Sequence, residues 1–127
     1  MTELSRSSRS GAILVIDDEI YARDALILLL ERHGYTVLAA ADGSEALLHL
    51  NSDVPVALIL LDLKMPGMSG WEFRQRQLAD ARWAGIPTVV LSGLSLSPTD
   101  LATLQIRSAI EKPYSLEEVL RFARAYV

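Results

Sequence analysis

The sequence predicts a doubly wound α/β fold, in which helices cover both faces of a parallel sheet. Short, continuous apolar runs alternate strictly with segments of helical periodicity along the 127 residues. A continuous apolar run is typical of a strand buried on both faces, as the strands of a parallel sheet are. Strict alternation of strands and helices indicates repeated βαβ units in one layered domain. Hydrophobic residues make up 50% of the chain and aromatic residues 6%, so the core is expected to be aliphatic.

Strands are predicted at five apolar runs, residues 12–16, 35–40, 56–61, 87–91 and 108–110. The run 56–61 is strongly apolar, which places it near the centre of the sheet, and the run 108–110 is the weakest. Right-handed crossovers leave few topologies open. Of the two common strand orders we expect the flavodoxin-like order 2-1-3-4-5, an expectation taken from known proteins of this class and not from the spacing.

Helices are predicted between and after these runs, over residues 20–33, 42–50, 71–80, 99–104 and 115–125. In the first, leucines recur at i, i+3 and i+4, and Gly34 ends the pattern. Asp42 and Ser115 are each followed three residues later by Glu, the signature of a capping box. Ser97 precedes a proline, which suits the first position of the fourth helix.

Composition limits the possible functions. The formal net charge is −4, which argues against a nucleic-acid-binding surface because such surfaces are normally basic. The chain has no cysteine, which excludes disulfides and is compatible with the cytoplasm. No run reaches the roughly 20 apolar residues that span a bilayer, so no membrane contact is expected. Residues 1–10 are rich in Ser and Arg, and we expect a flexible arm before a single domain at residues 11–127.

Polar residues stand where the predicted strands end. Asp17 and Asp18 follow the first strand, Asp62 the third, Ser92 the fourth and Lys112 the fifth. Ligands of open α/β sheets bind outside the carboxyl ends of the strands, so these side chains are expected to converge. Clustered carboxylates need a cation, and oxygen ligands suit Mg²⁺. One carboxylate could then attack phosphorus as a nucleophile, while the ammonium offsets charge on the transferred phosphoryl group.

These motifs resemble the response-regulator receiver family over nearly the whole chain. The resemblance is carried by Ile16-Asp17-Asp18-Glu19, by Leu61-Asp62-Leu63-Lys64 with the Met-Pro-Gly-Met-Ser-Gly that follows, by Leu91-Ser92-Gly93 and by Glu111-Lys112-Pro113. Each motif alone is suggestive, and their order at the predicted strand ends is specific. The resemblance implies a cytoplasmic signalling phosphoacceptor and not a classical enzyme. Such a domain catalyses its own phosphorylation by a sensor histidine kinase or histidine phosphotransfer protein, and in some cases its dephosphorylation.

The resemblance also implies a role for each site residue. Asp62 would accept the phosphoryl group. Asp18, Asp62 and the backbone carbonyl of Lys64 would ligate Mg²⁺ directly, and Asp17 would bind it through water. Ser92 would hydrogen-bond the phosphoryl group, and Lys112 would pair with it and precede a cis peptide bond to Pro113.

Two positions depart from the family pattern. Ala109 stands where the family usually has Tyr or Phe, and Gln105-Ile106 replaces the usual Gly-Ala before the last strand. The residues that carry the phosphotransfer chemistry are therefore expected to be intact. The surface that reports phosphorylation in the family is atypical here, so we expect a monomer or a weak dimer. Tyr114 occupies a position that packs in the family. The side chain of Lys64 could reach the phosphate or point into solvent.

Several of these motifs also fit other kinds of protein. Asp17, Asp18 and Glu19 could simply suit a helix N-terminus. A haloacid-dehalogenase-type phosphatase needs a second Asp where Lys64 stands, and a flavodoxin phosphate loop would be repelled by the Asp pair. A degenerate receiver that acts as a phosphorylation-independent protein-binding scaffold also stays open. His33 and His49 are expected to be structural or surface residues.

Overall fold

The predicted sheet topology is confirmed. In the computed structural model, which describes residues 11–64, 67–93, 96–106 and 108–127, five parallel strands lie in the order β2-β1-β3-β4-β5. The predicted arm at residues 1–10 lies outside the described residues. The elements are β1 (Ala12–Ile16), α2 (Ile20–Arg32), β2 (Val37–Ala40), α3 (Gly43–Leu50), β3 (Val56–Asp62), α4 (Gly70–Leu78), β4 (Thr88–Ser92), α5 (Pro98–Leu104), β5 (Ser108–Glu111) and α6 (Leu116–Tyr126).

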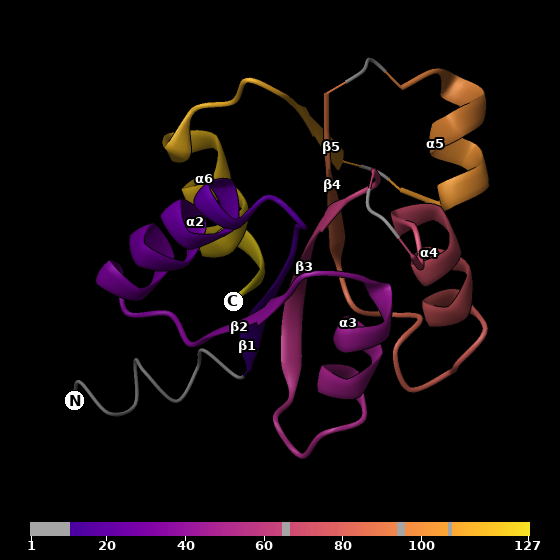
Figure 1. The fold of residues 1–127 in the computed structure, drawn as a ribbon, viewed down its shortest axis with the longest axis horizontal. Helices are drawn as coiled ribbons and strands as arrows, with labels where there is room; N and C mark the ends of the chain where they lie inside the picture. The colour runs from indigo at the N-terminus through magenta and orange to yellow at the C-terminus, as the bar shows by residue number, and fades with distance from the viewer. Residues whose placement is uncertain (1–10, 65–66, 94–95, 107) are drawn as a thin grey trace.

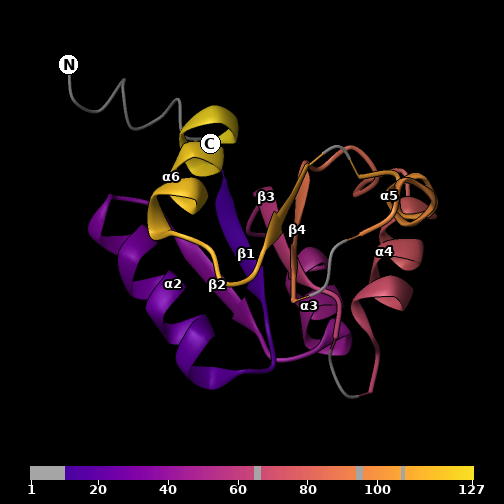
Figure 2. The same ribbon diagram turned by 90° about the horizontal axis from the view of Figure 1, so that it is seen from above.

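Helices cover both faces of the sheet. Figures 1 and 2 show α2 and α6 on one face and α3, α4 and α5 on the other. Successive side chains of a strand point to opposite faces. In β1, accordingly, Ile13 and Val15 belong to the core cluster beneath α2 and α6, whereas Leu14 and Ile16 belong to the cluster beneath the other three helices. All four are fully buried, which explains the uninterrupted apolar run.

Side-chain caps start the helices near the predicted residues. Ser97 and Ser115 form capping boxes with Asp100 and Glu118. Asp42 caps α3 as predicted, but the carboxylate of Glu45 accepts from the N–H of Ala41, so the predicted box with Asp42 is only half formed. Each cap satisfies backbone N–H groups that lack a partner within the helix.

Several element ends differ from the prediction by a few residues. β3, β4 and β5 each extend to include the first polar residue after the apolar run, because hydrogen bonding continues past the last apolar side chain. β2 begins two residues later than predicted because the N–H of Tyr35 donates to the carbonyl of Leu30, which ends α2. Gly34, with φ +86°, makes that turn possible.

Gly70 brings the start of α4 against the end of β3. A Cβ built at this residue would lie 2.5 Å from the carbonyl oxygen of Asp62 and 2.5 Å from Cα of Leu63, far closer than real Cβ contacts allow. The N–H of Gly70 donates to the carbonyl of Leu63. Any larger residue would push α4 away from the strand end that carries Asp62.

Candidate functional site

Three carboxylates meet at the carboxyl edge of the sheet. Asp62 is the last residue of β3, and Asp17 and Asp18 directly follow β1, the neighbouring parallel strand. One oxygen of each of these residues lies within 4.8 Å of the others. Asp17 is 0% exposed and Asp62 6%, whereas Asp18 is exposed. The structure therefore brings together the three acidic residues that the sequence placed at this edge.

Lys112 supplies a positive charge to the cluster. Its Nζ lies 3.5 Å from Oδ2 of Asp62 and 3.7 Å from Oδ2 of Asp17. One ammonium thus serves two buried carboxylates, with a third carboxylate close by. Burial raises the pKa of Asp17. The hydrogen bond from the N–H of Glu19 and the charge of Lys112 lower it, and the charge of Asp62 raises it again.

Asp17 Oδ2 is the least satisfied atom of the site. It is buried and has no hydrogen-bond partner among the residues that the structure describes, although Lys112 lies nearby. Buried carboxylate oxygens are normally hydrogen-bonded or coordinated to a metal, because desolvating a charge is costly. An unpartnered acidic oxygen beside two further carboxylates is therefore suited to a hard divalent cation.

Backbone hydrogen bonds hold the acidic loops. The N–H of Glu19 donates to Asp17 Oδ1 at 2.9 Å, and the N–H of Lys64 donates to Asp62 Oδ1 at 3.2 Å. Arg23, one turn into α2, donates from Nη1 to the backbone carbonyl of Asp17 at 2.9 Å. Sequence reasoning missed Arg23, because an arginine early in a helix gives no signal that it reaches back to the preceding loop.

Ser92 ends β4, beside β3, and is 7% exposed. Its carbonyl accepts the N–H of Lys112 at 2.6 Å, which ties the ends of β4 and β5 together. The side chain of Lys64 is exposed. Ala109 is an exposed residue of β5, so its methyl group lies on the surface at the position where the family usually has an aromatic ring.

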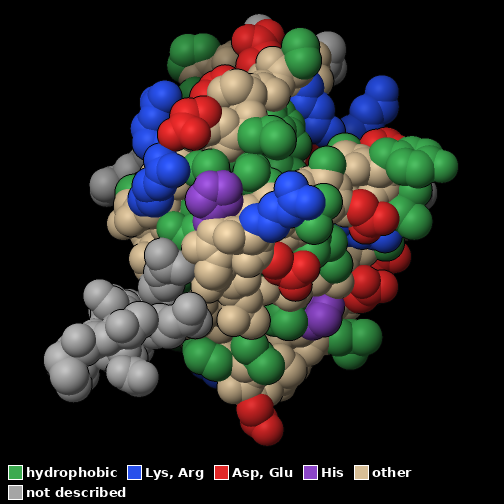
Figure 3. Space-filling model, turned by 90° about the vertical axis from the view of Figure 1, so that its left-hand side faces the viewer, with side chains coloured by type: hydrophobic (Ala, Val, Ile, Leu, Met, Phe, Trp, Pro, Cys, Tyr) green, Lys and Arg blue, Asp and Glu red, His purple; other side chains and the backbone are tan. Residues whose placement is uncertain are grey.

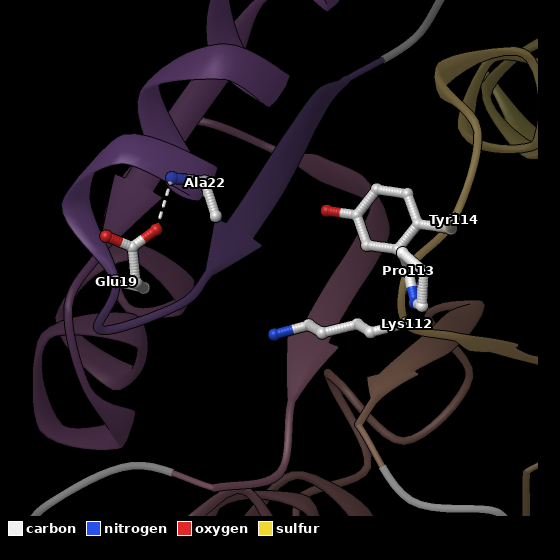
Figure 4. A pocket seen from close by; sticks show the side chains of 5 residues that line it. All are labelled: Glu19, Ala22, Lys112, Pro113 and Tyr114. Atoms are coloured by element: carbon white, nitrogen blue, oxygen red, sulfur yellow. Dashed lines mark hydrogen bonds between the residues drawn. The ribbon is translucent and has the colours of Figure 1, made fainter.

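A pocket opens beside the cluster, with a volume of about 550 Å³. Figure 4 shows Glu19 and Ala22 from the start of α2 on one side and Lys112, Pro113 and Tyr114 on the other, with the Lys112 ammonium and the Tyr114 hydroxyl both directed toward α2. The Lys112–Pro113 bond is cis, as the resemblance implied. Tyr114 packs against the core, as expected. Burial, then the charges of Asp17 and Asp62, raise its pKa to about 12.

None of the helices in the described ranges is long and apolar enough to cross a membrane. Figure 3 shows the side of the molecule where α2 and α6 lie, and there acidic and basic side chains are interspersed. A single-sign basic region, the usual footprint of nucleic-acid binding, does not occupy this face.

The chain matches the family model for the response regulator receiver domain over residues 13–124. It is 39% identical to the response regulator MprA of Mycobacterium ulcerans, covering 91% of this chain and 50% of that protein. It is 32% identical to the alkaline phosphatase synthesis transcriptional regulatory protein SphR of Synechococcus elongatus, covering 94% of this chain and 49% of that protein. The chain thus spans about half the length of these two curated relatives.

Solved structures agree with the sequence relatives. The chemotaxis response regulator CheY4 of Vibrio cholerae is 26% identical with a TM-score of 0.81, covering 92% of this chain and 98% of that one. The response regulator TrrA of Thermotoga maritima, solved in complex with Mg²⁺-BeF, is 26% identical with a TM-score of 0.78, covering 92% and 99%.

Proposed function

Because the chain belongs to the response regulator receiver family, we propose that it accepts a phosphoryl group on Asp62 from a phosphohistidine. Receiver domains take phosphoryl groups from histidine kinases, so a sensor histidine kinase or a histidine phosphotransfer protein is the proposed donor. The observation that carries the proposal is the convergence of Asp17, Asp18 and Asp62 with Lys112 at one edge of the sheet.

The residues present fit Mg²⁺. Receiver domains bind this ion at an acidic pocket, and the related TrrA was solved with Mg²⁺-BeF. Here the fit rests on three carboxylates within 4.8 Å and on the buried, unpartnered Oδ2 of Asp17. We propose that Asp18, Asp62 and the carbonyl of Lys64 ligate the ion directly and that Asp17 binds it through water. When bound, Mg²⁺ offsets negative charge on the carboxylates and on the phosphoryl oxygens.

Asp62, Lys112 and Ser92 have different roles in the phosphoryl transfer. A carboxylate oxygen of Asp62 forms a bond to phosphorus while the P–N bond of the donor phosphohistidine breaks. The electron pair of that bond stays on the imidazole nitrogen, which then takes up a proton. The Lys112 ammonium, already 3.5 Å from Asp62 Oδ2, offsets charge on the phosphoryl oxygens. Ser92, at the end of the neighbouring strand, donates its hydroxyl to one of those oxygens.

The test is labelling by acetyl phosphate, followed by intact-mass spectrometry with and without Mg²⁺. We expect one added phosphoryl group that requires Mg²⁺ and is absent from Asp62→Asn. Asp53→Asn, which removes an exposed carboxylate from the loop before β3, is the matched control and should label like the wild type. Equal labelling of the wild type and Asp62→Asn would overturn the proposal.

A phosphorylation-independent scaffold is the second candidate, and Ala109 favours it. An exposed methyl group offers no ring to turn inward when the site is phosphorylated. Failure of Asp62 to label in the experiment above would support this reading. The cytoplasmic location, the monomeric or weakly dimeric state and the absence of direct nucleic-acid binding remain predictions. Phosphotransfer profiling against the histidine kinases of the source genome would identify the donor.

A further inference from the structure

A buried arginine lies at the other end of the sheet from Asp62. Arg74, on α4, is 5% exposed and lies against Thr88, the first residue of β4, and against the end of α5. In a parallel sheet, strand starts and strand ends form opposite edges, so Arg74 is remote from the carboxylate cluster. The proposed phosphotransfer makes no use of it.

The hydrogen bonds of Arg74 all go to uncharged acceptors. Nε and Nη2 donate to the carbonyls of Leu104 and Gln105 at 2.9 and 3.0 Å. Nη1 donates to Oε1 of Gln77 at 2.8 Å and to Oγ1 of Thr88 at 3.1 Å. A guanidinium carries five N–H groups, and these contacts use four of them, so within the described part of the chain one N–H on Nη2 has no acceptor.

The positive charge of Arg74 is incompletely balanced. Across the described residues, none of the ion pairs includes it. The carbonyls at the end of α5 carry only partial charge, roughly half a unit for a whole helix terminus. Burial accordingly lowers the pKa of Arg74. A buried charge without a counter-ion is costly, so an anion here would be favourable.

A pocket of about 350 Å³ borders this arginine. Besides Arg74, its polar lining comes from Thr88, Gln105, Ser108 and Tyr126, and none of the described lining residues is acidic. Gln77, which accepts from Arg74, is fully buried, and its Nε2 donates to the carbonyls of Trp83 and Ile86. The guanidinium is thus held in place beside a pocket whose described lining residues include no Asp or Glu.

From this arrangement we infer a second ligand site: Arg74 and the lining hydroxyls bind a small oxyanion, a phosphate or a carboxylate, at the edge of the sheet opposite Asp62. The remaining N–H on Nη2 is fixed in place by the other contacts of the guanidinium, and a charge-assisted hydrogen bond from it suits one oxygen of an oxyanion. Ser108 and Tyr126 supply hydroxyls at the rim. The site is independent of phosphorylation chemistry, because no residue is shared between them.

The test follows the Nε–H resonance of Arg74 by ¹H–¹⁵N NMR during titration with sodium phosphate or sodium acetate, at ionic strength held constant with chloride. Asp62→Asn is run in parallel so that phosphate at the carboxylate edge is not mistaken for this site. We expect a saturable shift in both proteins with half-saturation in the millimolar range. A response to phosphate alone identifies a phosphate ligand, and an equal response to acetate identifies a carboxylate.

Two matched variants locate the binding. Arg74→Lys keeps the charge but loses the rigidly held guanidinium and its remaining N–H, and we expect it to weaken binding at least about tenfold, measured on the amides of Gly85 and Ser108. Arg76→Lys changes an exposed arginine of the same helix and should bind like the wild type. A linear, unsaturable response, or equal affinity in Arg74→Lys, would overturn the inference. The wild-type Nε–H titration needs no variant, so the test survives if Arg74→Lys fails to fold.

Discussion

Replacing Asp62 with Asn should stabilise the domain in the absence of divalent cations. The three carboxylates each have an oxygen within 4.8 Å of the others, and at an effective dielectric of about 20 like charges at that limit repel by about 3.5 kcal/mol. Asp62 has two such partners, Asp17 and Asp18. Its attraction to Lys112 at 3.5 Å is worth about 4.7 kcal/mol on the same scale. The repulsion from the two carboxylates exceeds the attraction to Lys112 by about 2 kcal/mol. Solvent screening of the exposed Asp18 reduces this excess, so we expect Asp62→Asn to raise the free energy of unfolding by about 1 to 2 kcal/mol.

Urea unfolding at pH 7.5 measures this difference, first in EDTA and then with Mg²⁺. In EDTA, Asp62→Asn should unfold at higher urea than the wild type with the same dependence on denaturant. With Mg²⁺ about 100-fold above its Kd, the wild type should gain about 2.7 kcal/mol and the order should reverse. Asp53→Asn should unfold at the same urea concentration as the wild type in both conditions. An Asp62→Asn protein that is no more stable than the wild type in EDTA would refute the account of the cluster as a repulsive site.

Three further outcomes follow from single contacts. Arg23→Met removes the donor to the Asp17 carbonyl and should weaken Mg²⁺ binding by roughly 10-fold, with partial rescue in Arg23→Lys, measured by tryptophan fluorescence titration. Tyr114 has a pKa of about 12 against about 10 when unfolded, so it stabilises the domain below pH 10 and loses that contribution as the pH rises to 12. Stability should therefore fall less steeply over this range in Tyr114→Phe, as urea midpoints would reveal. Gln105 has φ +53°, so Gln105→Gly should raise the unfolding free energy by up to about 1 kcal/mol, measured in urea.

The site at the strand ends could be predicted from two simple rules. Apolar runs end where strands end, and parallel strands place their ends at one edge. Asp17 and Asp62 are far apart in sequence, yet the register pairs Ile16 with Leu61, the residues just before them. No knowledge of side-chain conformations was needed to bring the two carboxylates together.

The Arg74 network could not be predicted in the same way. A charged residue in a polar-looking helix is expected on the surface, and the sequence Arg-Gln-Arg-Gln offers no reason to bury Arg74 and expose Arg76. The partners that justify burial, the carbonyls of Leu104 and Gln105, lie 30 and 31 residues away and are backbone atoms. Only the packed arrangement of α4 against α5 reveals them, because any residue type would present the same carbonyls.

We expect the site to be coupled to the rest of the domain through the backbone of β4 and β5. The N–H of Lys112 donates to the carbonyl of Ser92 at 2.6 Å, so a displacement of Ser92 moves the strand end that carries the ammonium. Ala109 cannot respond through its side chain, because a methyl group has no rotamers to exchange. The residues after Lys112 differ in this respect, since Tyr114 is half-buried against the core beneath α6 and borders the pocket next to Asp17. If Asp62 is phosphorylated as proposed, we therefore expect a movement of Lys112 toward the phosphoryl group to reach the surface through Tyr114 and the start of α6, and not through the exposed face of β5.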